Sequence, residues 1–191
     1  MQTIEELKRK IDSTEDLHGV VKTMKAMAAV KIRQFEKAAE SLDDYNQTVE
    51  MALQVMLRNR PNILIGARRQ VAGGMVGAVV FGSDQGMCGR LNDLIADHAV
   101  SELNHNNSEK KKQNRVMMAV GERIKNRLVD LKQPVQKYIA VPASVTGITA
   151  RVQDIVTSIE AWGRDNRFQQ VYLFYSRHLS GASYRAHTVR L

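Results

Sequence analysis

The residue types best suited to chemistry lie in one short segment, residues 82–92, which contains the single cysteine of the chain, Cys88. A cysteine at the start of a helix and beside an arginine, as Cys88 is beside Arg90, can be a reactive thiol. Catalysis by a cysteine ordinarily also needs a nearby base, and no histidine is close to Cys88 in the sequence. We therefore interpret Cys88 as a surface thiol and not as a catalytic nucleophile.

The same segment follows an apolar run and precedes a helical pattern, which is where phosphate-binding loops lie in many α/β proteins. Gly82 and Gly86 are four residues apart, so G-x-G-x-x-G is not formed, and G-x-x-x-x-G-K-S/T is also absent from the sequence. Nucleotide binding is therefore the less favoured interpretation. One cysteine and five scattered histidines do not make a set of metal ligands, so we expect no metal and no cofactor.

The composition indicates acidic partners. The formal net charge is +8 and the pI is about 9.7, which favours attraction to nucleic acid, anionic membrane surfaces or acidic protein loops. A run of three lysines at 110–112 lies in a polar stretch without aromatic residues. Because nothing there could stack on bases, we interpret the run as a solvated loop tip and expect no nucleic-acid partner.

The sequence shows no signal for export or for membrane insertion. A single cysteine excludes an intrachain disulfide and is typical of a reducing compartment. The first residues lack the basic and apolar regions of a signal peptide, and no apolar stretch approaches the ~20 residues that span a bilayer. We expect contact with a membrane only peripherally, through partners.

A long helix is predicted for residues 1–58, because residues 3–58 contain no proline and one glycine, Gly19. At ~1.5 Å per residue it would be roughly 80 Å long. A strict 3-4-3-4 spacing from Ile4 selects sixteen positions, and twelve of these are apolar, which is typical of a coiled coil. The twelve apolar positions are Ile4, Leu7, Ile11, Val21, Ala28, Ile32, Phe35, Ala39, Leu42, Val49, Leu53 and Met56.

This apolar row requires another helix. No second segment of the sequence matches its length, so we expect the partner helix on another chain or beyond Leu191. The row is weakest between Thr14 and Lys25, where Gly19 lowers helix propensity by ~1 kcal/mol relative to Ala. That weakness is either a local irregularity or a compliant section of a shaft, and both interpretations stay open.

The remaining chain predicts a small α/β domain at residues 75–191, joined to the helix by a linker at 59–74. Strands are expected at 76–81, 115–120, 135–141, 171–175 and 183–191, and helices at 91–103, 122–131 and 149–162. Alternating strands and helices predict a Rossmann-like α/β domain with a mostly parallel five-stranded sheet.

Two motifs, in the same order as in the family, resemble ATP synthase γ subunits. Residues 83–92 (SDQGMCGRLN) closely resemble the family signature S-D-R-G-L-C-G-G-x-N, and residues 23–33 (TMKAMAAVKIR) resemble A-M-K-M-V-A-A-x-K-L-R. Residues 171–177 (VYLFYSR) resemble the family's late strand. The resemblance extends along nearly the whole chain.

This resemblance implies a non-catalytic rotor of an F-type ATP synthase or ATPase. In the family, the N-terminal helix pairs with a C-terminal helix, whose motif is not found within residues 1–191, and the pair stands inside a ring of α and β subunits. The α/β domain is the foot beside the ε subunit and the membrane c-ring. Such a subunit couples ion flow to ATP synthesis or hydrolysis, and it lies peripherally on the cytoplasmic face of the inner (plasma) membrane of a bacterium.

The resemblance also implies which residues contact other subunits. They are Met24, Lys25, Met27, Lys31 and Arg33 on the helix, and Asp84, Gln85, Cys88 and Arg90 in the loop, which in the family faces an acidic lever of the β subunits. For each helix residue, an equally favoured alternative is that it is an ordinary residue of the apolar row or of the solvated face, with no special role in subunit contact.

The loop departs from the family at two positions. Gln85 stands where the family usually has Arg, and Arg90 stands where it usually has Gly. We therefore expect Arg90 to take over contact with the acidic lever, in a divergent branch such as the N-type ATPases. Two alternatives of other classes stay open: a nucleotide-binding α/β protein with a helical arm, and a basic coiled-coil adaptor for nucleic acid.

Overall fold

The computed structural model describes residues 3–59, 74–105, 115–164, 168–181 and 183–191. The chain divides into two compact units, Met1–Gly66 and Ala67–Leu191. Most of the predicted linker at 59–74, and the lysine run at 110–112, lie outside the described residues.

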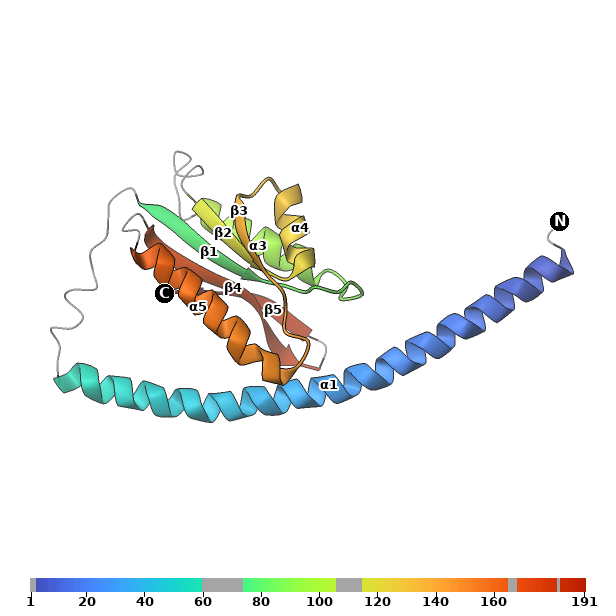
Figure 1. Ribbon diagram of the computed structural model, residues 1–191, viewed down its shortest axis with the longest axis horizontal. Helices are drawn as coiled ribbons and strands as arrows, with labels where there is room; N and C mark the ends of the chain where they lie inside the picture. The colour runs from blue at the N-terminus through green and yellow to red at the C-terminus, as the bar shows by residue number, and fades with distance from the viewer. Residues whose placement is uncertain (1–2, 60–73, 106–114, 165–167, 182) are drawn as a thin grey trace. The chain divides into compact units, whose positions relative to one another are not determined.

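The first unit is one helix, α1 (Ile4–Asn59), of 56 residues. It begins with a reciprocal cap, in which the Thr3 N–H donates to the Glu6 carboxylate (3.2 Å) and the Glu6 N–H donates to the Thr3 hydroxyl (3.4 Å). The helix continues through Gly19, where Thr23 Oγ1 donates to the Gly19 carbonyl (3.0 Å), and it curves gently along its length (Figure 1).

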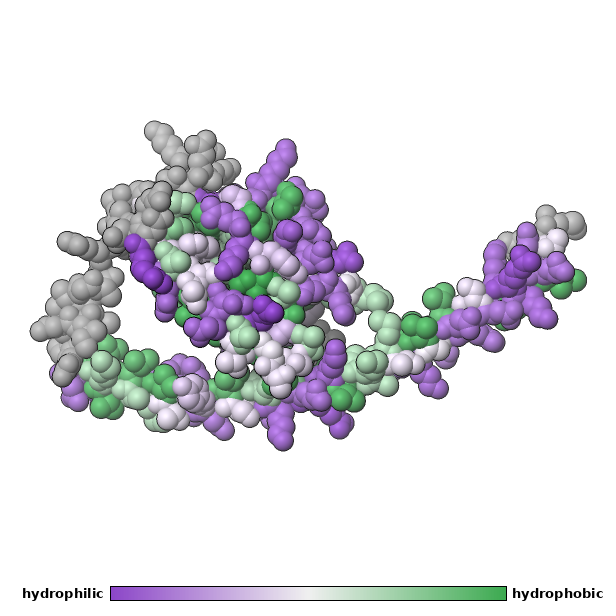
Figure 2. Space-filling view, in the orientation of Figure 1, coloured by the Kyte–Doolittle hydropathy of each residue, from purple (hydrophilic) through white to green (hydrophobic). Residues whose placement is uncertain are grey.

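No residue of α1 is buried. Sixteen of its large apolar side chains are exposed, and Figure 2 shows apolar side chains along its visible face. Eight of the sixteen belong to the predicted apolar row, whereas the other eight lie outside it: Leu17, Val20, Met24, Met27, Val30, Tyr45, Met51 and Val55. Apolar surface is therefore present on more than one side of α1.

The second unit is a five-stranded sheet with helices on both faces (Figure 1). The strands are β1 (Met75–Phe81), β2 (Arg115–Val120), β3 (Val135–Ile139), β4 (Phe168–Ser180) and β5 (Ser183–Arg190), in the order β3-β2-β1-β4-β5. The first four are parallel, and β5 runs antiparallel to β4. The predicted fold class is confirmed.

The helices of this unit are α3 (Leu91–His105), α4 (Glu122–Asp130) and α5 (Ile148–Arg164), which follows a short 3₁₀ turn, Val145–Gly147. One core lies between the sheet and α3 and α4, and includes Ile95, Ile124 and Phe174. A second core lies on the α5 face and includes Val79 and Ile155. β1 and β2 are buried on both faces, as their continuous apolar runs predict.

Two strand predictions are wrong at their ends. β4 spans Phe168–Ser180 and not 171–175, because it pairs with β1 from Phe168 onward and with β5 as far as Ser180. β3 ends at Ile139 and not at Val141, because the Val141 N–H donates to the Asp84 carboxylate (2.7 Å) instead of to a neighbouring strand.

Candidate functional site

The predicted contact loop connects the carboxyl end of β1 to α3. Gly82 opens it, and the Gly82 N–H donates to the Val120 carbonyl of β2 (2.8 Å). A Cβ at this position would collide with Asn92 Oδ1 and with the Ile124 side chain. Glycine is therefore required here by close packing, which is a structural reason for this residue that needs no phosphate ligand.

The polar side chains at the base of the loop bond to one another. Asn92 Oδ1 accepts from the Ser83 N–H (3.0 Å), and Asn92 Nδ2 donates to Ser83 Oγ (2.9 Å) and to Cys88 Sγ (3.2 Å). Ser83 Oγ lies 2.8 Å from the Gln85 carbonyl and 3.3 Å from the Cys88 sulfur. Asn92 and Ser83 therefore fix the path of the loop and the half-buried position of Cys88.

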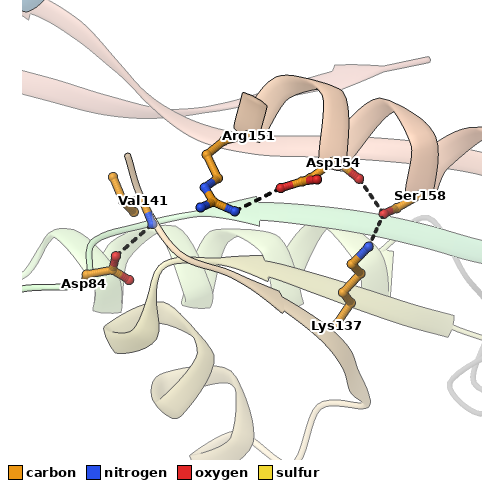
Figure 3. Close-up of polar contacts among 6 residues, drawn as sticks. All are labelled: Asp84, Lys137, Val141, Arg151, Asp154 and Ser158. Carbon is orange, nitrogen blue, oxygen red and sulfur yellow. Dashed lines mark hydrogen bonds and ion pairs between the residues drawn. The ribbon is translucent and has the colours of Figure 1, made fainter. Parts of the chain in front are cut away.

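Asp84 joins three elements of the domain. Its carboxylate accepts from the Glu122 N–H at the start of α4 (2.7 Å), from the Tyr138 hydroxyl on β3 (3.1 Å) and from the Val141 N–H (2.7 Å, Figure 3). A carboxylate at a helix N-terminus is favoured by the helix dipole. These bonds give Asp84 a role inside the domain, whereas a contact with another subunit remains a prediction for this residue.

Tyr138 is affected by this arrangement. The pKa of Tyr138 is raised above its ordinary value, first because its hydroxyl is partly removed from water. Its hydrogen bond to Asp84, and then the charges of Asp84 and Glu122, raise this pKa further. The neutral hydroxyl is therefore favoured in the folded chain.

The other predicted loop residues form an exposed rim. Gln85 and Arg90 are exposed, and Met87 is 87% exposed. The backbone of Met87 has φ 60° and that of Gly89 has φ 57°, which are left-handed conformations. Such a conformation is unfavourable for a residue other than glycine, so the structure holds Met87 outward at some cost in free energy. A shallow groove of about 340 Å³ beside the rim is lined by residues such as Cys88, Arg123 and Arg127.

Cys88 Sγ contacts Ser83, Asn92 and the Gln85 carbonyl. Among the residues that the structure describes, no group of three His, Cys, Asp or Glu side chains could hold a metal ion.

A serine–lysine pair on the α5 face resembles a catalytic dyad, since Lys137 Nζ lies 2.7 Å from Ser158 Oγ (Figure 3). However, Ser158 Oγ donates its proton to the Asp154 carbonyl (2.6 Å) and accepts from the lysine. The lysine is a donor here and not a base, so the pair is structural.

The predicted helix residues all lie on exposed α1. Met24, Met27 and Lys31 follow one another at spacings of three and four, so they share one side of the helix. Lys25 and Arg33 are eight residues apart, which places them about 80° from each other around the helix, and both lie outside that side. The helix residues and the loop residues belong to different units.

Sequence reasoning missed the residues that hold the loop in place. Asn92 was included in the motif without a role, and Tyr138 and Gly121 were not selected. Gly121 has φ 119°, and a Cβ there would lie 2.9 Å from backbone atoms of Ser83. A glycine directly after a buried strand was the available signal for this close approach.

Comparisons with known proteins agree with this architecture. The sequence profile of the ATP synthase family matches residues 3–191. The ATP synthase gamma chain of Sinorhizobium medicae is 29% identical over 105 residues, covering 52% of this chain and 35% of that protein. That of Dechloromonas aromatica is 29% identical over 115 residues, covering 59% and 39%. The matches therefore span less than half the length of these curated relatives.

Solved structures give the same fold. A chain in the central stalk and c-ring structure of the Tetrahymena thermophila mitochondrial ATP synthase matches with a TM-score of 0.55 and 25% identity, over 73% of this chain and 58% of that one. A chain of the Euglena gracilis mitochondrial ATP synthase matches with a TM-score of 0.52 and 18% identity, over 96% and 55%. Since the family profile covers almost every residue, the chain belongs to the family of ATP synthase γ chains.

Proposed function

We propose that the chain acts as the central rotor shaft of an F-type ATP synthase, coupling ion flow in the membrane sector to ATP synthesis or hydrolysis in a ring of α and β subunits. The observation that carries the proposal is α1, which has 56 residues, no buried residue and sixteen exposed large apolar side chains. Family membership supports this function over the nucleotide-binding and nucleic-acid alternatives.

A helix of this kind needs partners along its length. Burying one large aliphatic side chain contributes about 1.5–3 kcal/mol, so leaving a long row of them in water is unfavourable. The next longest helix among the described residues, α5, has 17 residues and cannot cover α1. The predicted apolar row could be buried by a second helix, and the apolar side chains outside the row could be buried by the inner surface of a ring.

The proposed mechanism is mechanical and needs no active site in this chain. An asymmetric shaft gives each catalytic subunit different contacts, so their nucleotide affinities differ, and rotation exchanges those contacts. The exposed cations Lys25, Lys31 and Arg33, which point in different directions around α1, and a cation at Arg90 fit acidic surfaces of the ring. The hydrogen bonds of Asp84 and Asn92 tie the loop to the rest of the α/β unit, which fits a role in transmitting force.

The proposed location is peripheral to the cytoplasmic face of a bacterial inner membrane, with the α/β unit as the foot beside ε and the c-ring. Among the described residues, no helix is both long and apolar enough to cross a bilayer. We propose that attachment to the membrane is through the partner subunits.

Affinity purification of the tagged chain from its native host tests the proposal. We expect α and β subunits and ATP hydrolysis to be recovered with it. As a matched pair, Leu42→Asp in the apolar row should reduce recovery, whereas Lys37→Asp, one turn away on the charged side, should reduce it less. A chain that is recovered without these subunits contradicts the proposal.

Two binding measurements separate the alternatives. The purified chain should show no binding of ATP in a calorimeter, whereas tight binding would favour a nucleotide-binding α/β protein. It should also bind duplex DNA no more tightly than other basic proteins do. A tight affinity that falls steeply with salt would favour a nucleic-acid adaptor.

A further inference from the structure

The hairpin of β4 and β5 extends past the end of the sheet. β1 pairs with β4 only as far as Val80↔Phe174, whereas β4 and β5 remain paired to Ser180↔Ser183. Residues 175–181 and 183–187 therefore form a two-stranded projection, here called the β4–β5 arm. Beyond Phe174, no described strand pairs with β4 on the side of β1, so an edge able to accept another strand is left there.

The arm carries an unfavourable pair of charges. Arg177 and Arg185 are directly opposite each other across the two strands, and both are exposed. Like charges in this position repel, and neither arginine forms an ion pair with a carboxylate of the described residues. His187 lies on the same face, with its ring edge-on to Tyr175 at 5.2 Å.

Nearby sequence offers no compensation for these charges. From residue 166 to residue 191 there are four arginines and no aspartate or glutamate. A hollow of about 350 Å³ is lined by Arg177, Arg185 and His187 together with His178, Leu179 and Ala186. An anion from another molecule would relieve the repulsion in this hollow.

An apolar groove of about 620 Å³ adjoins the basic hollow and shares His178 with it. It surrounds the end of β1, and its lining includes Phe81, Leu91, Leu173, Tyr175 and Tyr184. Leu179, at an irregularity in the β4–β5 pairing, is 53% exposed and lines the basic hollow. Basic and apolar surfaces therefore meet along one strand edge.

We infer that the β4–β5 arm is a docking surface for an acidic, amphipathic segment of a partner protein. Carboxylates of the segment would pair with Arg177 and Arg185, since the guanidinium group matches a carboxylate with two parallel hydrogen bonds. Its apolar side chains would fill the groove. An extended segment presents alternate side chains to opposite sides, so one strand added at the free edge supplies both contacts.

The apolar groove favours a protein over other anions. A phosphodiester backbone would satisfy the arginines but brings no aliphatic side chains to the groove, and a flat bilayer surface would not enter it. The inference goes beyond the proposed rotor function and does not depend on it: the arginines lie on the β4–β5 arm, and the loop at 82–92 contributes only Gly82 and Leu91 to the groove lining.

Binding of a labelled peptide to the full chain tests the inference. The probe is a short fluorescein-labelled peptide of alternating Glu and Leu, followed by fluorescence anisotropy. We expect binding that Arg177→Gln with Arg185→Gln weakens about tenfold or more, which corresponds to losing one or two charged hydrogen bonds. Tyr184→Ser should also weaken binding, through the groove. The control double variant, Arg151→Gln with Arg164→Gln on α5, removes the same net charge and should leave affinity nearly unchanged.

Three outcomes would overturn the inference. The control could weaken binding as much as the arm variant, which would mean that only net charge is sensed. A matched peptide of Gln and Leu could bind equally well, which would mean that carboxylates are not recognised. Duplex DNA or phosphatidylglycerol vesicles could bind more tightly than the peptide and depend on Arg177 and Arg185, which would assign the arm to phosphates. Thermal unfolding of each variant checks that the fold is intact.

Discussion

Asp84 and Val141 are 57 residues apart in the sequence, yet the Asp84 carboxylate accepts a 2.7 Å hydrogen bond from the Val141 N–H. The same carboxylate accepts from the Glu122 N–H and from the Tyr138 hydroxyl. One side chain in the loop after β1 therefore holds the start of α4 and the end of β3 in place. A loop fixed in this way is a firm base for the exposed residues that follow it.

Asp84→Ala should destabilise the α/β unit by about 3 kcal/mol, because three donors lose a charged acceptor. We expect the thermal midpoint to fall by about 5–15 °C, measured by circular dichroism. Asp97→Asn is the matched control, since Asp97 is more than half exposed and contacts only Arg127, at 3.5 Å, in the described structure. Equal losses in the two variants would contradict the role assigned to Asp84.

Tyr138 should make the stability of the α/β unit depend on alkaline pH. Its pKa is raised in the folded chain, so the folded state retains this proton at pH values where the unfolded chain has begun to lose it. The contribution is fully present below about pH 10 and is lost as pH rises through the folded pKa. Urea unfolding at increasing pH should show this loss, and Tyr138→Phe should reduce it. Tyr45→Phe, on α1, should not.

Gly82 and Gly86 provide a test of packing within one loop. Gly82→Ala should destabilise the chain by about 1–3 kcal/mol, because a methyl group there collides with Asn92 and Ile124. Gly86→Ala should be tolerated, since the nearest atom to its Cβ is the end of the Arg123 side chain, at 3.5 Å. Denaturant midpoints measure both effects. A Gly82→Ala variant as stable as Gly86→Ala would show that the loop yields easily.

The sequence predicts those parts of the fold that depend on local pattern. β1 and β2 are uninterrupted apolar runs, as strands buried on both faces should be, and α1 has no internal breaker other than Gly19. The far half of β4 could not be predicted in this way. Its residues from Ser176 onward are mostly polar and become strand because β5 pairs with them.

In the candidate loop, too, local sequence pattern predicts only part of the structure. The motif at 83–92 identifies the segment, but it cannot separate Asp84, which bonds inward, from Arg90, which is exposed. That division depends on Tyr138 and on the Val141 N–H, and both are more than fifty residues away. No local periodicity carries information about partners at such a distance.

The Arg177 and Arg185 pair predicts a stabilising substitution. Arg185→Thr should raise the stability of the isolated chain by about 0.2–1 kcal/mol, because it removes a cross-strand repulsion and keeps a residue that favours strands. The gain should shrink at high salt, which screens exposed charges. Urea unfolding at two salt concentrations measures it. Arg164→Thr, at the end of α5 beside Glu160, is the control and should give no gain.

Arg90 and Gln85 provide the sharpest test of the loop in the ATP synthase of which we propose the chain is a part. Both side chains are exposed, but only Arg90 carries a charge able to meet an acidic surface, and no carboxylate of the described residues pairs with it. Arg90→Ala should therefore reduce the ions pumped per ATP hydrolysed in membrane vesicles more than Gln85→Ala does. The expected contact is worth about 1 kcal/mol, or roughly fivefold.

Arg90→Lys retains the charge and should preserve most of the coupling. Added salt should reduce the difference in ions pumped per ATP between Arg90→Ala and the unsubstituted chain, because salt screens exposed charges. Equal effects of Arg90→Ala and Gln85→Ala would exclude a special role for the arginine. In that case the backbone of the rim, held outward at Met87 and Gly89, would be the better candidate for the contact, because neither alanine substitution alters it.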